Sequence, residues 1–267
     1  MFQLPERTEA DPLSSMSNLV SLYLLQDKWK PAEQLWRSII PMMTEKLGKV
    51  HPHTLTCMAS LATTYSNQGR YQAAEELLNE VVQTRKTLFG IEHTGTLSST
   101  EKLALVLMKQ GQYQEAEKFL EQVTEARERF LGKEHPDTLQ SKANLALIYD
   151  NQGRYEEAQQ AGQLLMEIMD RVLGEDHPDT ISTRGNLALS YSHQGRYEEA
   201  EVLEERVTRE STRVLGGERV QTLTYMANLA LTYYERAKYE DAKKLATEVL
   251  AKEANIFNET HPTRFPC

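Results

Sequence analysis

The sequence predicts an all-α protein, an α-solenoid assembled from six copies of one helix-turn-helix unit. Two observations support this fold class: the chain repeats itself every 42 residues, and each copy contains two helical segments. The stretch from Leu131 to Ala158 returns as Leu173 to Ala200, with matching Leu-Gly, His-Pro-Asp-Thr, Asn-Leu-Ala and Gly-Arg-Tyr sequences. A fixed period of this size indicates repeats that bury their apolar faces against one another.

Columns of equivalent residues fix the register and the number of copies. An alanine recurs at intervals of 42, an aromatic residue stands three positions before each one, and columns of mainly leucine and tyrosine keep the same phase. The alanines are Ala32, Ala74, Ala116, Ala158, Ala200 and Ala242. We therefore expect an N-terminal tail at residues 1–11, a repeat array at 12–257 and the start of an incomplete seventh repeat at 258–267.

Each copy divides into a helix A and a helix B. In the fourth copy, Pro136 marks the start of helix A, which is expected over 138–151 because its apolar residues follow helical spacing. Gly153 suits the left-handed turn that ends it. Helix B is expected from Tyr155 to about Leu173. Ala158 is small where two helix axes approach within roughly 8–10 Å.

Some positions depart from the repeat pattern. Pro41 stands within helix B of the first copy, where proline is expected to break or kink a helix. Ala237 replaces the turn glycine, and Glu204 stands where a large apolar residue is expected. The last helix B, from Tyr239 to about Asn255, is expected to cap the array with its lysine-rich face.

Composition narrows the function class. The net charge of −9 argues against non-specific nucleic-acid binding. The sequence contains no apolar run long enough to span a membrane and no secretory signal at its start, so we expect a cytoplasmic protein without membrane contact. Its two cysteines, Cys57 and Cys267, are expected to be a buried thiol and a terminal one rather than a disulfide.

Histidines recur in one column, at His51, His93, His135 and His177. Equivalent residues of stacked helices lie roughly 10 Å apart, whereas zinc ligands lie about 2 Å from the ion. We therefore expect these histidines to cap the linkers, and we expect no metal and no cofactor. No nucleophile, metal-protease or redox motif is present, so enzyme activity is not expected.

The repeat unit resembles a known family. Leu61, Ala62, Tyr65, Ala74 and Leu78 follow the spacing of the tetratricopeptide (TPR) repeat. The longer period and the Leu-Gly-x-x-His-Pro linker resemble the repeats of kinesin light chains and the C-terminal arrays of fungal and bacterial NB-ARC or NACHT receptor-like proteins. The resemblance implies a right-handed superhelix whose concave groove binds peptide segments of other proteins.

The resemblance also implies which residues line that groove. The expected groove residues are Asn144, Asn186, Asn228, Lys102, Lys142 and Arg184. The asparagines occupy one column of helix A and are expected to bond to the backbone of an extended peptide. The three cations form a predicted basic strip that would favour an acidic peptide. A structural alternative stays open, in which the asparagines bond to the neighbouring helix and hold the array together.

The preferred function is therefore a protein-binding scaffold or adaptor without catalysis. One alternative is an oligomerising or ligand-sensing tail of a receptor-like system, in which self-association is possible. A less favoured alternative is an accessory subunit of an enzyme, for which a polar constellation that breaks the period would be needed.

Overall fold

The computed structural model describes residues 12–260, and over this range it contains twelve α-helices and no strand. The chain forms two compact units, residues 1–110 and 111–267. The first unit contains α1 (Pro12–Leu25), α2 (Trp29–Leu47), α3 (Pro52–Asn67), α4 (Tyr71–Phe89) and α5 (Thr94–Lys109). The second contains α6 (Tyr113–Leu131), α7 (Pro136–Asn151), α8 (Tyr155–Val172), α9 (Pro178–His193), α10 (Tyr197–Val214), α11 (Val220–Glu235) and α12 (Tyr239–Thr260).

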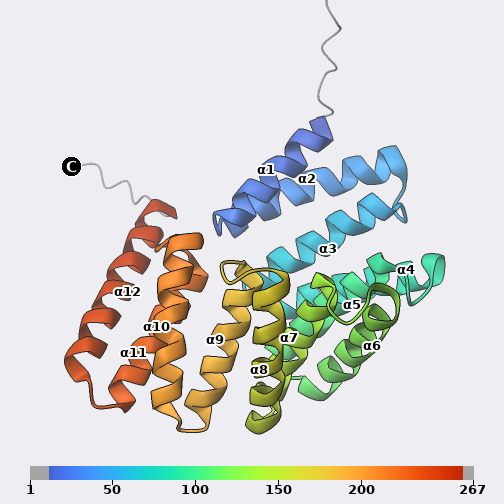
Figure 1. The fold of residues 1–267 in the computed structure, drawn as a ribbon. Coiled ribbons are helices and arrows are strands. Elements are labelled where there is room, and N and C mark those ends of the chain that lie inside the picture. Colours follow the sequence, from blue (N-terminus) through green and yellow to red (C-terminus); the bar gives the residue numbers. More distant parts are fainter. Residues whose placement is uncertain (1–11, 261–267) are drawn as a thin grey trace, which may run out of the picture. The chain divides into compact units, whose positions relative to one another are not determined.

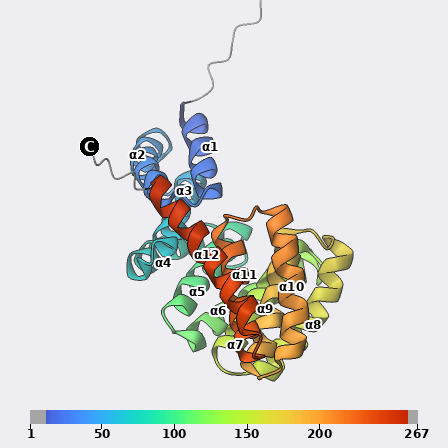
Figure 2. The ribbon, with the colours of Figure 1, turned by 90° about the vertical axis from the view of Figure 1, so that its left-hand side faces the viewer.

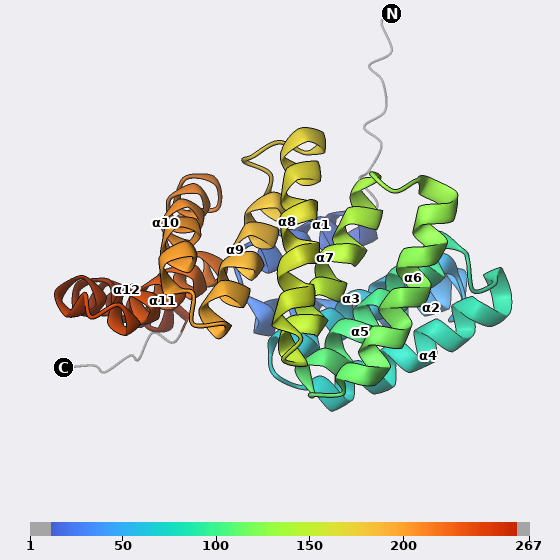
Figure 3. The same cartoon turned by 60° about the horizontal axis from the view of Figure 1, so that its bottom comes forward.

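Within each unit every helix packs against the next one in the chain, as Figure 1 shows. Helices A of adjacent repeats also touch, namely α3 with α5, α7 with α9 and α9 with α11. In the second unit α11 and α12 form the last pair, side by side in the views of Figures 2 and 3. The predicted α-solenoid is confirmed in this packing of consecutive helices.

The alanine column of the repeats lies in the hydrophobic core. The repeat alanines are buried where helices A and B approach each other; Ala158, for example, is 3% exposed. In the second unit Leu187, Tyr191 and Ala200 form one apolar cluster, which joins α9 to α10. Burial of such apolar side chains against the neighbouring helix stabilises each pair.

Histidine side chains start four of the helices A. The Nδ1 atoms of His51, His93, His135 and His177 accept the backbone N–H two residues ahead, at 3.1–3.3 Å. Each of these histidines occupies the N-cap with extended backbone. The predicted linker-capping role is therefore confirmed, because the imidazole satisfies one of the free amides of the first turn.

Two of the unusual positions behave differently from each other. The helix α2 runs without interruption through Pro41, so the expected break does not occur. Ala237 does take over the turn from glycine, with a φ of 60° in the left-handed region that L-residues rarely adopt. The last helix α12 extends to Thr260, beyond the expected end near Asn255. The His-Pro start predicted for the seventh repeat at 261–263 and the tail at 1–11 lie outside the described residues.

Candidate functional site

The predicted asparagine column lies on the helices A of the second unit. Asn144 stands on α7, Asn186 on α9 and Asn228 on α11, at equivalent places of successive repeats. Asn144 is buried and accepts a hydrogen bond from Gln140 Nε2 at 3.3 Å. Asn186 and Asn228 are half-buried, and neither side-chain amide bonds to any of the described residues. Two members of the column thus present open donors and acceptors.

A small polar network lies close to this column, between α9 and α11. Gln221 Nε2 donates to Ser182 Oγ at 2.6 Å and to Tyr225 Oη at 2.8 Å. A Cβ atom at Gly185 would lie 2.6 Å from the Tyr225 ring, so glycine is required for this approach. Burial raises the pKa of Tyr225, which keeps the phenol a neutral hydrogen-bonding group. This network joins α9 to α11, the two helices that carry Asn186 and Asn228.

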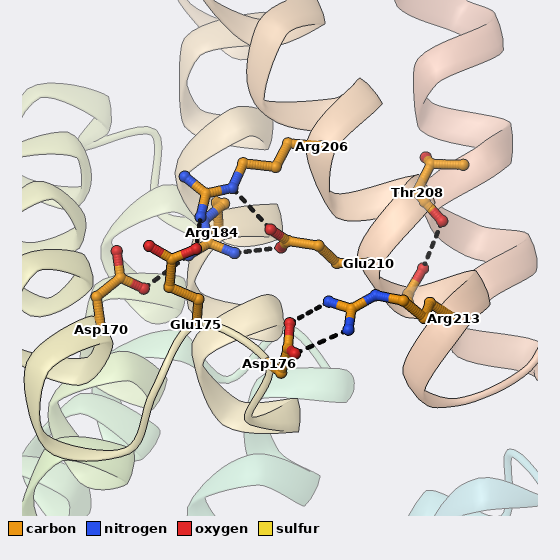
Figure 4. A network of polar contacts seen from close by, with 9 residues as sticks. Asp170, Glu175, Asp176, Arg184, Arg206, Thr208, Glu210 and Arg213 are labelled. Carbon is orange, nitrogen blue, oxygen red and sulfur yellow. Dashed lines mark hydrogen bonds and ion pairs between the residues drawn. The ribbon is translucent and has the colours of Figure 1, made fainter.

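Arg184 does not lie at the surface beside Asn186 and Asn228. Its side chain has no exposed surface, and it forms ion pairs with Asp170 at 2.7 Å and with Glu210 (Figure 4). A guanidinium enclosed in this way reaches a ligand only if both of these ion pairs break. The prediction that Arg184 contributes to the groove is therefore corrected: it is a buried link between α8, α9 and α10.

Further ion pairs surround this link. Arg206 donates to Glu210 at 2.7 Å and to Glu175 at 2.8 Å, and Arg213 pairs with Asp176 through both terminal nitrogens (Figure 4). Glu175 and Asp176 lie in the loop between α8 and α9, whereas both arginines belong to α10. The network therefore ties that loop to the next helix B.

The two other predicted cations are also engaged. Lys142 pairs with Glu128 of α6 at 2.6 Å, one repeat before the equivalent pair of Arg184 with Asp170. In the first unit, burial lowers the pKa of Lys102, whose Nζ lies 3.4 Å from Thr63 Oγ1. Arg184 is thus buried, Lys142 is neutralised by Glu128, and Lys102 is half-buried. Of the three cations of the predicted basic strip, the structure therefore removes Arg184.

The structure reveals a repeated contact that we did not predict from the sequence, which we call the turn clasp. At the A–B turn, Gln152 Nε2 and Arg154 Nη1 donate to the same carboxylate, Glu117 of the preceding helix B, both at 2.7 Å. The Arg154 guanidinium also lies over the Tyr149 ring, 4.2 Å from its centroid. Arginine thus joins three elements through charge-assisted bonds and a cation–π contact.

The clasp recurs with variations along the chain. In the first unit Gln68 and Arg70 hold Glu33, and Gln110 holds Glu75. In the last repeat Arg236 and Lys238 occupy the places of Gln152 and Arg154, and both donate to the Glu201 carboxylate. Burial raises the pKa of Glu201, but the hydrogen bonds from the two cations outweigh it and the net pKa is lowered. Glutamine, arginine and glutamate recur at these positions with the 42-residue period, and this recurrence is the sequence signal that would have predicted the clasp.

A buried carboxyl group lies beside the last clasp. Glu204 of α10 is 4% exposed and faces the hydroxyls of Ser192 and Thr232, which lie 3.3 Å from each other. Burial raises its pKa to about 7, and the nearby charge of Glu201 adds to this rise. Glutamate occupies the place of Leu78 and Leu120 in earlier copies, so its polarity is a local departure from the core.

Among the described residues, no group of three histidine, cysteine or acidic side chains is placed to hold a metal ion. Cys57 is a free, buried thiol whose pKa burial raises. Cys267 lies outside the described residues. No helix in the described part of the chain is long and apolar enough to cross a bilayer.

Family models of the tetratricopeptide repeat match the chain over residues 13–53, 54–95, 95–168, 142–209 and 222–263. The chain belongs to the tetratricopeptide-repeat family. A solved structure of a Podosopora anserina putative kinesin light chain with nearly identical TPR-like repeats is 32% identical. The match covers 77% of this chain and 97% of that one, with a TM-score of 0.58. The predicted likeness to kinesin light chain-like TPR proteins is therefore confirmed.

Two more distant solved structures share the fold. BtubC (BKLC) from P. vanneervenii is 18% identical over 95% of this chain and 96% of its own, with a TM-score of 0.62. NprR in complex with its cognate peptide NprX is 16% identical over 93% of this chain and 68% of its own, with a TM-score of 0.71. Among curated proteins, no sequence matches this TPR chain.

Proposed function

We propose that this TPR protein is a non-catalytic cytoplasmic adaptor that binds an extended segment of a partner protein across α7, α9 and α11. The observation that carries the proposal is the pair of open amides at Asn186 and Asn228, half-buried at equivalent places on adjacent helices. An amide side chain donates and accepts at once, so it suits the alternating N–H and C=O groups of a peptide backbone.

The repeat spacing matches such a ligand. Packed helices lie roughly 8–10 Å apart, and an extended chain advances about 3.3 Å per residue. One repeat therefore spans about three residues of an extended peptide, and Asn186 and Asn228 would meet two backbone groups three residues apart. TPR proteins of the same fold support this use, since NprR was solved with its cognate peptide bound.

The ligand proposed here needs no acidic character. The expectation of an acidic peptide depended on the three cations, and Glu128, Asp170 and Glu210 neutralise two of them within the protein. Recognition of backbone groups by neutral amides is insensitive to the charge of the segment. We therefore expect binding that changes little between low and high salt.

The test compares Asn186→Ala/Asn228→Ala with wild-type protein. Peptides selected from a random displayed library on the wild type would be measured by fluorescence anisotropy, with Asn67→Ala as the matched control on an exposed helix end. We expect the double variant to weaken binding at least tenfold with an unchanged melting temperature. N-methylation of peptide amides at a three-residue spacing would weaken binding to the wild type similarly.

Two results would overturn the proposal. Equal binding of the selected peptides by the wild type and the double variant would remove the asparagines from the site. A fall of several degrees in melting temperature would show that the column supports the stack instead. The receptor-tail alternative predicts that the ligand changes the assembly state, which sedimentation with and without the selected peptide distinguishes.

A further inference from the structure

Inside the second unit, three contacts at two successive junctions show how helix A of the next repeat packs on the preceding one. Gly162 of α8 packs against the Leu187 side chain of α9, 25 residues further on. The Ser192 and Thr232 hydroxyls, 40 residues apart, lie at 3.3 Å, and the rings of Tyr155 and His193, 38 residues apart, have centroids 5.3 Å apart. These three sequence spacings, 25, 40 and 38 residues, define which residues of one repeat contact helix A of the following repeat.

On the last helix pair of the second unit, the corresponding residues line an open surface. Ala246, Tyr234 and Tyr239 stand where Gly162, Ser192 and Tyr155 stand in the earlier junctions. They line an apolar hollow of about 690 Å³ between α11 and α12, together with Leu231 and Leu250. Tyr234 and Tyr239 are 58% and 59% exposed, and Leu250 is 65% exposed. We call this surface the C-terminal face.

Helix α1 has the complementary surface. As the helix A of the first repeat it exposes Leu19, Leu22 and Leu25, at 40%, 53% and 65%. The equivalents of Leu19 and Leu22 on α11 are Leu229 and Thr232, only 4% and 2% exposed. Leu25 stands where later copies carry polar residues. We call these three leucines the N-terminal face.

We propose that copies of this chain associate head to tail, with α1 of one copy lying on α11 and α12 of another. The same three spacings then pair the two faces residue by residue. The pairs are Ala246 with Leu19, Tyr234 with Leu22 and Tyr239 with Leu25. The contact continues the junction already built between repeats inside the second unit, and each exposed leucine of α1 meets an apolar partner in that register.

The turn clasp is not reproduced at this junction. Lys243 occupies the place of Glu201, and the residues it would meet on the second copy are Gln26 and Lys28. Two cations then face each other where an ion pair stands in the interior. Apolar burial therefore carries the association, which we expect to be weak and to strengthen as salt screens Lys243 from Lys28.

The two faces differ from each other, so the contact is heterologous. Such a contact adds further copies until a ring closes or a filament grows. The average mass of the wild-type protein should therefore rise with concentration beyond that of a dimer.

The test is sedimentation velocity on the full chain and on two charge variants, Leu22→Glu and Tyr234→Glu. Each variant loses one face and keeps the other, so each alone should be a monomer at every concentration. Mixed in equal amounts, they should form a dimer and nothing larger, because only one intact pair of faces remains. Val202→Glu, which changes an exposed apolar residue of α10, should assemble like the wild type.

A gain-of-function variant checks the register. Lys243→Glu restores the acidic partner of the clasp and should lower the concentration of half-association about two- to fivefold. Circular dichroism of every variant confirms that the helices persist. A wild-type protein that stays monomeric at millimolar concentration would overturn the proposal. Continued self-association of Leu22→Glu alone would also overturn it and would indicate contact between two C-terminal faces.

Discussion

The carboxylate of Glu117 accepts a hydrogen bond from Arg154 at 2.7 Å, although the two residues lie 37 positions apart in the chain. The bond connects helix B of one repeat with the A–B turn of the next. Gln152 bonds to the same carboxylate, and Tyr149 supports the guanidinium from the other side. Neighbouring repeats are thus joined by directed polar contacts as well as by their apolar cores.

The clasp predicts a measurable coupling between these two residues. Arg154→Ala, Glu117→Ala and the double variant form a cycle whose interaction free energy should be about 0.5–1 kcal/mol, since both groups are partly exposed. Urea unfolding monitored by circular dichroism measures it. Gln160→Ala, an exposed change on α8, should leave stability unchanged. Strict additivity of the two single variants would mean that the clasp contributes nothing.

The buried ion link makes a second prediction. Arg184→Ala should destabilise the protein by about 3 kcal/mol, because it breaks the ion pairs to Asp170 and to the buried Glu210, which then keeps its pair with Arg206. Arg184→Met combined with Asp170→Asn and Glu210→Gln should recover most of that loss, since it removes the charges together. Denaturant unfolding compares the two. If the triple variant is no more stable than Arg184→Ala, stranded charge is not the cause.

The third prediction concerns pH. Burial raises the pKa of Glu204 to about 7 from an ordinary value near 4.5. The folded state then holds this proton more tightly than the unfolded state does. Stability from this group is complete below about pH 4.5 and is lost as pH rises through 7, by about 3 kcal/mol in total.

Glu204→Gln tests this prediction, because glutamine keeps the shape and removes the titration. The difference in unfolding free energy between variant and wild type should grow from pH 5 to pH 8 in favour of the variant. Taking the difference cancels the opposite contribution of the clasp carboxylates, such as Glu201, whose pKa is lowered. A difference that stays constant over this range would show that Glu204 titrates normally in the folded state.

The fourth prediction concerns the strained turn at Ala237, where φ is 60°. Ala237→Gly should stabilise the protein by about 0.5–1 kcal/mol, because glycine adopts this conformation without a steric penalty. Thermal unfolding should show a rise of a few degrees at most. The matched change Ala251→Gly, at an exposed position inside α12, should lower stability by a similar amount.

The sequence was sufficient for features that depend on local or periodic signals. The repeat columns located the helices, and the histidine N-caps followed from their place before Pro-Asp-Thr and related sequences. Of the two outcomes expected for Pro41, a break or a kink, the break does not occur, because one proline removes a single hydrogen bond and clashes locally, which the packing of α2 on α3 can outweigh. The periodicity of the sequence does not give the relative size of the local cost of proline and the gain from helix packing.

The candidate site was only partly predictable for the same reason. Asn186 and Asn228 share a column and do share a face, because the column sets the helix face. Arg184 follows its helix equally well, yet its long side chain turns inward to meet carboxylates of α8 and α10. Which direction a long cation takes depends on partners from other elements, and a single sequence does not reveal that pairing.

The distance along the chain between bonded residues has a consequence for how the protein is made. Side-chain hydrogen bonds between repeats join positions about one repeat apart, such as Lys109 with Ser66 and His193 with Asp150, each pair 43 positions apart. Low sequence separation of contacts favours rapid folding. Each pair of helices meets its partners as soon as the next repeat has left the ribosome, so the array should acquire structure progressively during translation, from its first repeats onward.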